Sequence, residues 1–443
     1  MNKSILFFAT LLIFVGCEQQ FDGDSGVKLS FNVDTVNFDT VFANSISSAV
    51  RLTVYNSSDK NILVDISAEN GDNSNFIFNI NGCMSYSVKD VPILKNDSII
   101  IFIQSDIKTS QNEVYEIEHL NFYTGGEKQS VDIKSYALNP VILSGIIVKD
   151  SLLNADRVYL IKDSVVVDNN VELTVLKGCK FYFNRDSYLK INGSVKCEGS
   201  LDSMILFSSS RLGKNYADIP GQWRGLNFEK NSYDNILNYV EIINARTGIL
   251  ANGIDNNTSL RISGAVIKNH TYAGLVLSNC KCLMYNSLVA NCGFNCVLIS
   301  SGGYYDFYHC TLAEYYKYSY RNGSALSIEN IDITNFNALI ANSIIYGSSS
   351  NEVDFDISYQ DKIKFLNCLL RTTITYDNSL VNCVLNPDFK FADIDNNNFI
   401  LINDSPAIDA GNKEITDTTE YLQKDFFEKS RTTTLPDAGY AEF

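Results

Sequence analysis

Three acidic side chains alternate along one short segment, in the order Glu352-Val-Asp354-Phe-Asp356. Residues two apart project from the same face of a β-strand, so a strand here would gather the three carboxylates on one face. Carboxylate oxygens grouped in this way suit a cation such as calcium. The alternative is a solvated outer face that binds nothing. The three residues are the candidates for a metal site, and the sequence does not identify the metal.

A second candidate site lies in a tyrosine-rich segment. Seven of the seventeen residues from Tyr304 to Tyr320 are tyrosine. Exposed tyrosine rings stack on sugar rings, and their hydroxyl groups hydrogen-bond to sugar hydroxyls. In the alternative interpretation, the rings fill the interior or cover the flank of the fold. The residues predicted to contact a ligand are Tyr315, Tyr316, Tyr318, Tyr320 and Arg321.

The cysteines and histidines indicate structure rather than catalysis. Cys292 and Cys296 are spaced like metal ligands, but Cys310 and Cys368 are predicted to occupy the same place in successive turns of a repeat, as buried small groups do. Buried thiols are the first expectation, followed by one or two disulfides. His309 is interpreted as a hydrogen-bonded structural group. We name no catalytic residue and expect no cofactor.

The first residues carry an export signal. The apolar run from Ile5 to Val15 is shorter than the roughly 20 residues that span a bilayer, and it is followed by Gly16-Cys17. A small residue before a cysteine resembles the lipid-attachment signal of bacterial lipoproteins. The resemblance implies a signal peptide in residues 1–17, ending at a lipidated Cys17 that anchors the protein through acyl chains. Residues 18–26 are predicted to form an acidic tether.

Length and charge limit the number of domains and the classes of function that remain open. The chain has 443 residues, which is too long for one hydrophobic core, so at least two domains are expected. The formal net charge of −16, without a basic segment, argues against nucleic-acid binding. With 45% hydrophobic and 19% charged residues, the chain has the composition of a folded protein.

Residues 27–139 are predicted to form a β-sandwich of immunoglobulin type. Short alternating segments such as Val50–Tyr55 and Ile62–Ile66 are separated by turn clusters such as the one at 56–59. The number and spacing of these segments fit a sandwich. A true immunoglobulin domain would also carry paired cysteines and a tryptophan, and this segment does not. Asn139-Pro140 marks the predicted boundary.

Residues 140–443 show a repeat. Apolar residues recur at intervals of 22 to 33 residues, namely Ile242, Ile267, Val289, Leu312, Ile345 and Leu370. A period in the low twenties without helical spacing predicts a parallel β-helix with three strands per turn. A leucine-rich repeat is the alternative, but its regular leucine pattern is absent. The longest interval predicts an insertion between Arg321 and Asn337.

Asparagines recur at one place in the predicted turn, at Asn244, Asn269 and Asn291. Asparagine tolerates the left-handed conformation that a sharp corner needs. We therefore predict left-handed corners at these residues. Their stacked amides are expected to hydrogen-bond to one another along the axis of the repeat.

Several motifs resemble those of known families. The segment 173–178, Leu-Thr-Val-Leu-Lys-Gly, looks like an opening turn of pectate-lyase-like β-helices. The segment 302–311, Gly-Gly-Tyr-Tyr-Asp-Phe-Tyr-His-Cys-Thr, is similar to a motif in uncharacterised β-helix lipoproteins of Bacteroidetes. The segment 405–411, Ser-Pro-Ala-Ile-Asp-Ala-Gly, resembles the closing segment of right-handed β-helices. The resemblance implies an all-β, outer-membrane lipoprotein, exposed on the surface or facing the periplasm, and implies no particular reaction.

Three functions remain open at this stage. The first is a lipid-anchored, non-catalytic envelope protein whose β-helix wall binds a glycan or another envelope protein. The second is a polysaccharide lyase or glycoside hydrolase; on this fold, a lyase would hold calcium with acidic residues. The third is a structural or adhesive component. In each case we expect a monomer held to the membrane by its lipid alone. Acidic and basic side chains converging in one groove would favour the enzyme.

Overall fold

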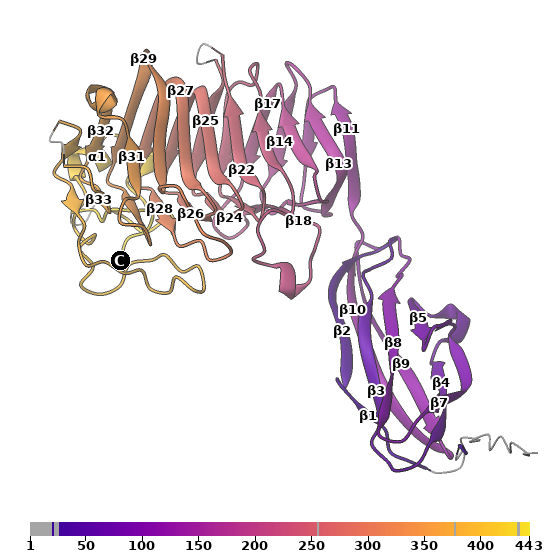
Figure 1. Cartoon of the computed structure of the whole chain (residues 1–443). Helices are drawn as coiled ribbons and strands as arrows, with labels where there is room; N and C mark the ends of the chain where they lie inside the picture. The colour runs from indigo at the N-terminus through magenta and orange to yellow at the C-terminus, as the bar shows by residue number, and fades with distance from the viewer. Residues whose placement is uncertain (1–19, 22–25, 255–256, 376–377, 432–434) are drawn as a thin grey trace, which may run out of the picture. The chain divides into compact units, whose positions relative to one another are not determined.

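The protein is all-β. The computed structural model describes residues 20–21, 26–254, 257–375, 378–431 and 435–443. The predicted signal peptide and Cys17 lie outside the described residues. The chain divides into two compact units, Met1–Leu138 and Asn139–Phe443 (Figure 1). Among the described residues, we find no helix with the length and apolar character needed to cross a membrane.

The first unit consists of two five-stranded sheets, with the orders β1-β3-β8-β5-β6 and β2-β10-β9-β4-β7. Every neighbouring pair is antiparallel except β2 and β10, which run parallel. Alternate residues of the strands are buried, as in β4, and those of both sheets share one hydrophobic core. The strands are β1 Ser30–Phe31, β2 Thr35–Phe42, β3 Val50–Asn56, β4 Ile62–Ala68, β5 Phe76–Ile80, β6 Cys83–Met84, β7 Ser87–Ile93, β8 Asp97–Ser105, β9 Glu113–Thr124 and β10 Glu127–Leu138.

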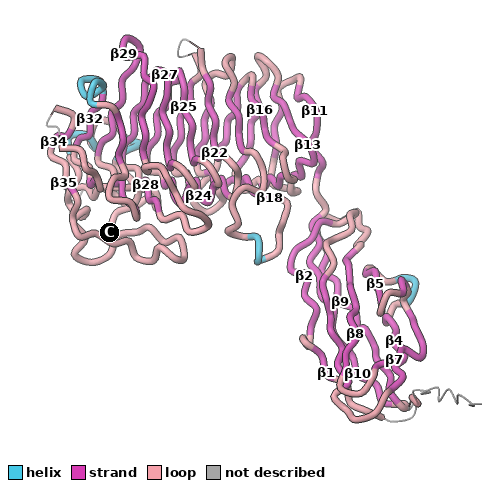
Figure 2. The backbone as a smooth tube through the Cα atoms, in the orientation of Figure 1, coloured by secondary structure: helices cyan, strands magenta, loops and turns pink. Residues whose placement is uncertain are grey.

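The second unit contains one 25-stranded sheet, and all its strand pairs are parallel. Its strands lie side by side in successive layers (Figure 2). Between β13 and β22, each strand pairs with the strand three later in the chain, so three strands complete one turn. From β25 onward, the long strands β25, β27 and β29 each span two of these positions.

The strands of the second unit are β11 Val141–Ile147, β12 Ser151–Leu153, β13 Tyr159–Val167, β14 Glu172–Leu176, β15 Lys180–Phe183, β16 Tyr188–Ile191, β17 Ser194–Glu198, β18 Ile205–Ser209, β19 Gly225–Phe228, β20 Asn235–Asn238, β21 Val240–Ile243, β22 Thr247–Asn252, β23 Ser259–Ser263, β24 Val266–His270, β25 Ala273–Tyr285, β26 Leu288–Cys292, β27 Asn295–Tyr308, β28 Thr311–Glu314, β29 Leu326–Ala341, β30 Ile344–Gly347, β31 Val353–Phe355, β32 Ile363–Leu366, β33 Leu369–Leu370, β34 Leu380–Val381 and β35 Val384–Leu385. The described helical elements of the chain are η1 Gly71–Asn73, η2 Lys214–Tyr216, η3 Ile357–Lys362, α1 Lys413–Thr416 and η4 Glu420–Leu422.

The register of the repeat is the one that the apolar spacing predicts. The six residues pair one with the next across adjacent parallel strands, and each is buried: Ile242, Ile267, Val289, Leu312, Ile345 and Leu370. Burial of such stacked side chains is the main stabilising term of the unit, at about 25 cal/mol per Å² of apolar surface. The predicted register is confirmed.

The predicted insertion is divided into two pieces. β28 ends at Glu314 and β29 begins at Leu326, so the first piece is the loop 315–325. The second piece lies inside β29, where the partners on β27 shift register on both sides of Ser301. A single insertion beginning at Arg321 is therefore wrong, because strand pairing resumes at Leu326 before it is interrupted again.

The predicted asparagine corners are confirmed in conformation but not in bonding. Asn244, Asn269 and Asn291 have φ of 63°, 60° and 55°. Their amides donate outward, as from Asn244 to the Ala217 carbonyl at 2.6 Å and from Asn269 to Asp218 at 3.1 Å. The predicted hydrogen bonds among the stacked corner amides are therefore wrong, because outer loops supply the acceptors.

The C-terminal segment packs against the strands through a buried arginine. The side chain of Arg431 is fully buried, donates to the carbonyl of Gly439 at 3.0 Å and pairs with the carboxylate of Glu442. The backbone N–H of Tyr440 donates to Thr311 Oγ1 at 3.2 Å, which joins the segment to β28. The segment therefore belongs to the second unit's packed structure.

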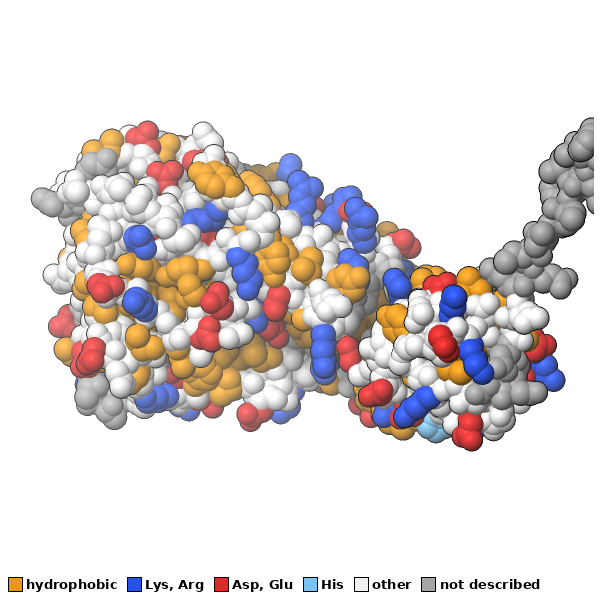
Figure 3. Space-filling view, turned by 60° about the horizontal axis from the view of Figure 1, so that its bottom comes forward, with side chains coloured by type: hydrophobic (Ala, Val, Ile, Leu, Met, Phe, Trp, Pro, Cys, Tyr) orange, Lys and Arg blue, Asp and Glu red, His pale blue; other side chains and the backbone are white. Residues whose placement is uncertain are grey.

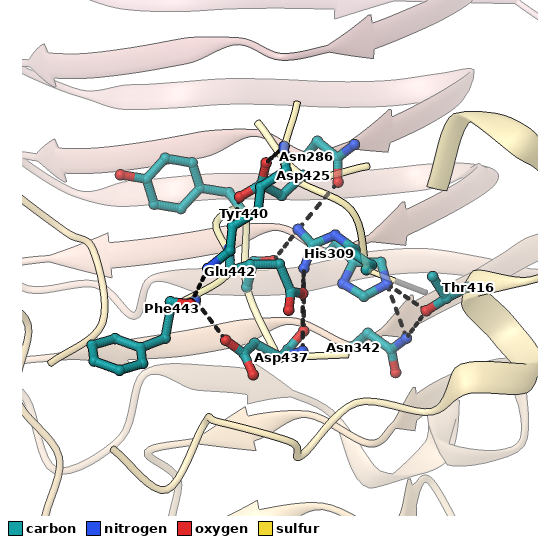
Figure 4. Close-up of polar contacts among 12 residues, drawn as sticks. Asn286, His309, Asn342, Thr416, Asp425, Asp437, Tyr440, Glu442 and Phe443 are labelled. Atoms are coloured by element: carbon teal, nitrogen blue, oxygen red, sulfur yellow. Dashed lines mark hydrogen bonds and ion pairs between the residues drawn. The ribbon is translucent and has the colours of Figure 1, made fainter. Parts of the chain in front are cut away.

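His309 lies in the same contact region. Its Nε2 is 2.9 Å from Thr416 Oγ1 and 3.1 Å from Asn342 Nδ2 (Figure 4). Burial lowers the pKa of His309 well below its ordinary value, and the charge of Arg431 acts in the same direction. His309 thus joins the C-terminal segment to the strands as a neutral group.

Candidate functional site

The four tyrosines predicted to bind a ligand lie in different environments. Tyr315 packs on Phe391 and Phe399, with ring centroids 6.1 Å and 6.3 Å away. The rings of Tyr316 and Tyr318 lie 5.6 Å apart, and Tyr316 is half-buried. The Tyr320 residue is 91% exposed. Tyr315 therefore faces the interior of the C-terminal packing, while exposure increases along the loop.

Arg321, the fifth predicted ligand residue, is buried in an ion pair. Its side chain is 7% exposed, and its Nη2 lies 2.6 Å from Glu352 Oε1. Glu352 is fully buried and also accepts hydrogen bonds from the backbone N–H groups of Ala325, at 2.9 Å, and Ser349, at 2.8 Å. Groups of the protein itself therefore supply the hydrogen bonds of the Glu352 carboxylate. The ion pair therefore fastens the loop 315–325 to the corner that precedes β31.

A second buried carboxylate, Glu314, replaces asparagine at the corner of its turn. The register places Glu314 and Gly347 where the preceding turn has Asn291. A Cβ atom at Gly347 would lie 2.3 Å from Glu352 Oε1, so only glycine leaves space for that carboxylate. The corner position is thus asparagine at 291, glutamate at 314 and glycine at 347. The two departures from asparagine occur at the turns against which the loop 315–325 packs.

Glu314 is held by backbone and thiol donors. Both its oxygens accept from the Cys292 N–H, at 3.0 Å and 3.1 Å, and Oε1 accepts from the Tyr316 N–H at 3.2 Å. Cys296 Sγ donates to Oε2 at 3.2 Å. Burial raises the pKa of Glu314 to about 8, and the nearby charge of Arg321 opposes that shift. The carboxyl group is therefore protonated in much of the neutral pH range.

Three potential metal donors meet at this corner. The thiols of Cys292 and Cys296 and the carboxylate of Glu314 lie within 4.8 Å of one another, and all three residues are buried. A structural zinc site requires four donors, and among the described residues only these three meet here. The carboxylate already accepts four hydrogen bonds, and Arg321 adds positive charge. The set does not fit a closed metal site.

The three carboxylates predicted to share one face, those of Glu352, Asp354 and Asp356, do not gather in the structure. Glu352 is buried, whereas Asp354 and Asp356 are exposed. Asp356 accepts a hydrogen bond from the Ser358 N–H at 2.8 Å and begins a 3₁₀ turn. The shared face predicted for the three carboxylates is wrong, because β31 spans only Val353–Phe355 and Glu352 lies at the corner before it.

A different group of side chains converges on the outer wall of the sheet. A hollow of about 350 Å³ lies over four neighbouring strands, β20, β23, β25 and β27. We call it the wall groove and define it by its charged and aromatic residues, which are Asp234, Arg261, Lys281, Tyr304 and Asp306. Acidic and basic side chains therefore meet in one groove, which is the arrangement expected to favour the enzyme.

The strand register positions the groove residues. Arg261 pairs with Leu283, which pairs with Asp306, so the two charges lie two strands apart. Lys281 pairs with Tyr304, two residues earlier on the same two strands. Neighbouring strands are about 4.8 Å apart, so charged side chains from different turns line one hollow.

The two cations of the groove are uncommitted. In the part of the chain that the structure describes, no hydrogen bond or ion pair joins the Arg261 or Lys281 side chain to a protein group. Asp234, in contrast, pairs with Lys196. Asp306 is half-buried, and this burial raises its pKa. The Tyr304 residue is 44% exposed, and its hydroxyl group donates to Asn335 Oδ1 at 3.2 Å.

A larger hollow, of about 670 Å³, lies near the end of the sheet. Its arginine, Arg371, is already engaged, with Nη1 2.9 Å from the Gly347 carbonyl and the guanidinium 5.3 Å from the ring centroid of Tyr346. On the face drawn in Figure 3, basic, acidic and hydrophobic side chains are interspersed. The hollow also contains an exposed lysine, Lys390, so the wall groove differs from it in having two uncommitted cations beside an exposed tyrosine, whereas Tyr346 is buried.

Sequence reasoning did not predict the four charged residues of the groove, although a signal was present for Arg261 and Asp306. Arg261, Leu283 and Asp306 are separated by 22 and 23 residues, which is the period of the apolar repeat. Extending the register outward from Val289 and Leu312 would have placed Arg261 and Asp306 in one column. The search for adjacent acidic residues overlooked them, because each turn contributes a single charge.

Comparisons with known proteins do not identify a family. No protein-family model and no curated protein matches the chain. One similar solved structure is described as "The details of glycolipid glycan hydrolysis by the structural analysis of a family 123 glycoside hydrolase from Clostridium perfringens" (14% identity, TM-score 0.19, 25% of this chain and 24% of that chain). Another is a PapD-like domain of human CEP192 (7% identity, TM-score 0.20, 32% of this chain and all of that domain). At these TM-scores, neither similarity bears on function.

Proposed function

We propose that the chain is a lipid-anchored cell-envelope protein, with an immunoglobulin-like β-sandwich followed by a right-handed parallel β-helix. Two sheets around one core support the sandwich. Parallel pairing that recurs every three strands, with stacked apolar residues, supports the β-helix. The Gly16-Cys17 motif supports the anchor and the outer-membrane location.

The wall groove is the proposed binding site, and a glycan is its proposed ligand. The observation that carries this proposal is the presence of two exposed, uncommitted cations, Arg261 and Lys281, beside an exposed tyrosine ring in one hollow. The Tyr304 ring would stack on a sugar face. The cations and Asp306 would hydrogen-bond to hydroxyl or carboxylate groups on its edges.

The charges of the groove suggest the kind of glycan. Two acidic and two basic side chains line the hollow, so it is locally balanced in a chain of net charge −16. Lys196 already neutralises Asp234, which leaves Arg261 and Lys281 facing Asp306. The overall charge repels strongly anionic polymers. A neutral or weakly acidic glycan is therefore the best match.

One observation favours an enzyme as the second candidate. The pKa of Asp306 is raised by burial, and Arg261 and Lys281 line the same groove. A carboxyl group with a raised pKa can donate a proton, and a basic side chain can accept one, as a polysaccharide lyase or glycoside hydrolase needs. We place binding without cleavage first, because Asp234, the second carboxylate of the groove, is already paired with Lys196.

A glycan screen with matched variants tests the groove. The full chain with Cys17→Ala is screened on a glycan array, and each hit is titrated by calorimetry and incubated for product analysis. Tyr304→Ala and Arg261→Ala should weaken a genuine hit, whereas Tyr320→Ala, which alters an exposed tyrosine elsewhere, should not. Equal binding by all three variants would reject the groove, and released products would establish the enzyme.

Fractionation of cells tests the anchor separately. Wild type should enter the membrane fraction and remain there after a high-salt wash, because acyl chains bind by burial in lipid rather than by charge. Cys17→Ala should lose that association. A variant that stays in the washed membrane would overturn the lipid anchor and leave the groove proposal unaffected.

A further inference from the structure

Two cysteines occupy equivalent positions in the last two turns of the sheet. Leu369 pairs with Val384 in parallel register, and Cys368 and Cys383 directly precede these two residues. The Val384 N–H donates to the Cys368 carbonyl at 2.8 Å, which fixes the two segments side by side. Neighbouring parallel strands lie about 4.8 Å apart, inside the roughly 4.4–6.8 Å that a disulfide spans between Cα atoms.

The two thiols also point in the same direction. Cys368 Sγ donates to the carbonyls of Leu366 and Ile340, both at 3.4 Å. Cys383 Sγ makes the equivalent contacts one turn later, with Phe365 at 3.4 Å and Val381 at 3.5 Å. Each thiol thus contacts the carbonyl two residues before it and a carbonyl of the preceding turn. Equal orientation on adjacent strands stacks one sulfur on the other.

We propose that Cys368 and Cys383 form a disulfide that closes the last turn of the sheet. The oxidant is a protein or small-molecule disulfide, which the export compartment supplies, so formation in the cell rests on the proposed envelope location. Cys383 reacts first because it is half-buried, whereas Cys368 is buried. The spacing of neighbouring parallel strands lies in the range between Cα atoms that a disulfide accepts.

The reaction balances as two thiol–disulfide exchanges. The Cys383 thiolate, after losing its proton, attacks one sulfur of the oxidant, which forms a mixed disulfide and releases a thiolate. The Cys368 thiol then loses its proton and attacks the Cys383 sulfur, which releases the second thiolate. Both released thiolates take up the two protons, so two thiols are oxidised and one disulfide is reduced. The neighbouring Cys368 thiol lowers the pKa of Cys383, consistent with its role as the first nucleophile.

The same column of the sheet provides a matched control. Cys310 makes equivalent contacts with the carbonyls of Met284, at 3.5 Å, and Tyr308, at 3.4 Å. The adjacent turns place Ser287 and Ser343 on either side of it, so Cys310 has no cysteine next to it in the column. Cys310 should therefore remain reduced under conditions that oxidise Cys368 and Cys383. Cys292 and Cys296 lie close together but are fully buried, which denies an oxidant access to them.

Peptide mapping tests the pair directly. The reduced full chain with Cys17→Ser is incubated folded with oxidised glutathione, alkylated in denaturant without reductant, and digested. We expect a linked peptide containing Cys368 and Cys383, and alkylated Cys310. Labelling of both Cys368 and Cys383 as free thiols, or a link at Cys292–Cys296 instead, would overturn the proposal. Cys310→Ser should retain the link, and Cys383→Ser should lose it.

Melting curves give a second readout that does not need the variants to fold. Reduction of the oxidised wild type should lower the Tm by several degrees, because the bond restricts the unfolded chain between residues 368 and 383. An unchanged Tm with an intact link would show a bond without a stabilising role and overturn the closing function. Protein isolated from cells is mapped in parallel. Free thiols there, with a link formed by glutathione, would support the pair and reject the envelope location.

Discussion

Arg321 and Arg261 belong to the same unit, but the fold uses their charges differently. Arg321 comes from the loop 315–325 and is buried against Glu352, with Glu314 nearby. Arg261 lies on β23, is exposed and has no protein partner in the described part of the chain. A cation that lies near many tyrosines, such as Arg321, is therefore not necessarily available to bind a ligand. What matters is whether the fold has already neutralised it.

The two environments also differ in what the loss of one charge leaves behind. Removing Arg321 would leave Glu352 buried without its counterion, in a place where its neighbours supply only backbone donors. Removing Arg261 would leave no buried charge, because its side chain is solvated. Loop fastening and ligand binding are therefore separable by mutation.

The largest expected effect comes from breaking the buried pair. Arg321→Ala should lower the free energy of unfolding by about 3–5 kcal/mol, because an uncompensated carboxylate remains in the interior. Chemical denaturation of wild type and variant measures this difference. Arg261→Ala is the matched control and should change stability by less than about 0.5 kcal/mol. Equal effects of the two substitutions would contradict the comparison.

The second prediction concerns the neutral acid beside the pair. The pKa of Glu314 is raised from 4.5 to about 8, so the folded chain keeps a proton that the unfolded chain releases. Stability from this group is therefore fully present below pH 4.5 and is lost as the pH rises towards 8. Relative to Glu314→Gln, the wild type should lose about 1 kcal/mol per pH unit across this window.

Denaturation of both proteins between pH 5 and 8 measures that difference. Glutamine keeps a neutral side chain of the same size, so the variant lacks this titration. The buried histidines His270 and His309 have lowered pKa values, so their contribution to stability decreases as the pH falls through their ordinary range, in both proteins alike. Their effect cancels in the comparison. A difference that is constant with pH would show that Glu314 is ionised throughout.

Part of this arrangement was predictable from the sequence. The register of the turns follows from stacked apolar residues such as Val289 and Leu312, because each turn must bury a side chain at the same place. The same register would have placed Arg261 and Asp306 in one column. The burial of Arg321 was not predictable, because the loop's path depends on Glu352 thirty-one residues later and on the space at Gly347.

The third prediction tests the wall groove, to which the exposed Arg261 belongs, through its tyrosine, Tyr304. Tyr304→Ala should weaken binding of a glycan hit by about 1–2 kcal/mol, roughly tenfold, because one stacking face is lost. Calorimetric titration measures the affinity, and the melting temperature is recorded on the same samples. Tyr304→Phe is the control, since it keeps the ring and removes only the hydroxyl group that bonds to Asn335. It should retain most of the affinity.

The smallest effect on stability is expected at Tyr320, within the loop 315–325. The Tyr320 residue is 91% exposed, so Tyr320→Ala removes little buried surface and should change the free energy of unfolding by less than about 0.5 kcal/mol. Tyr315→Ala should instead be clearly destabilising, because its ring packs on Phe391 and Phe399. Chemical denaturation of both variants compares these effects.

Tyr320→Ala and Tyr304→Ala together decide between the loop and the groove as the place where a glycan binds. If the loop were the ligand surface, Tyr320→Ala would weaken binding without a change in stability, since its exposed ring is free to stack. If the wall groove is the ligand surface, Tyr320→Ala leaves the affinity unchanged while Tyr304→Ala reduces it. Titration of both against one glycan separates these outcomes, because neither ring contributes much to folding. Loss of affinity in Tyr320→Ala alone would move the site from the wall groove to the loop.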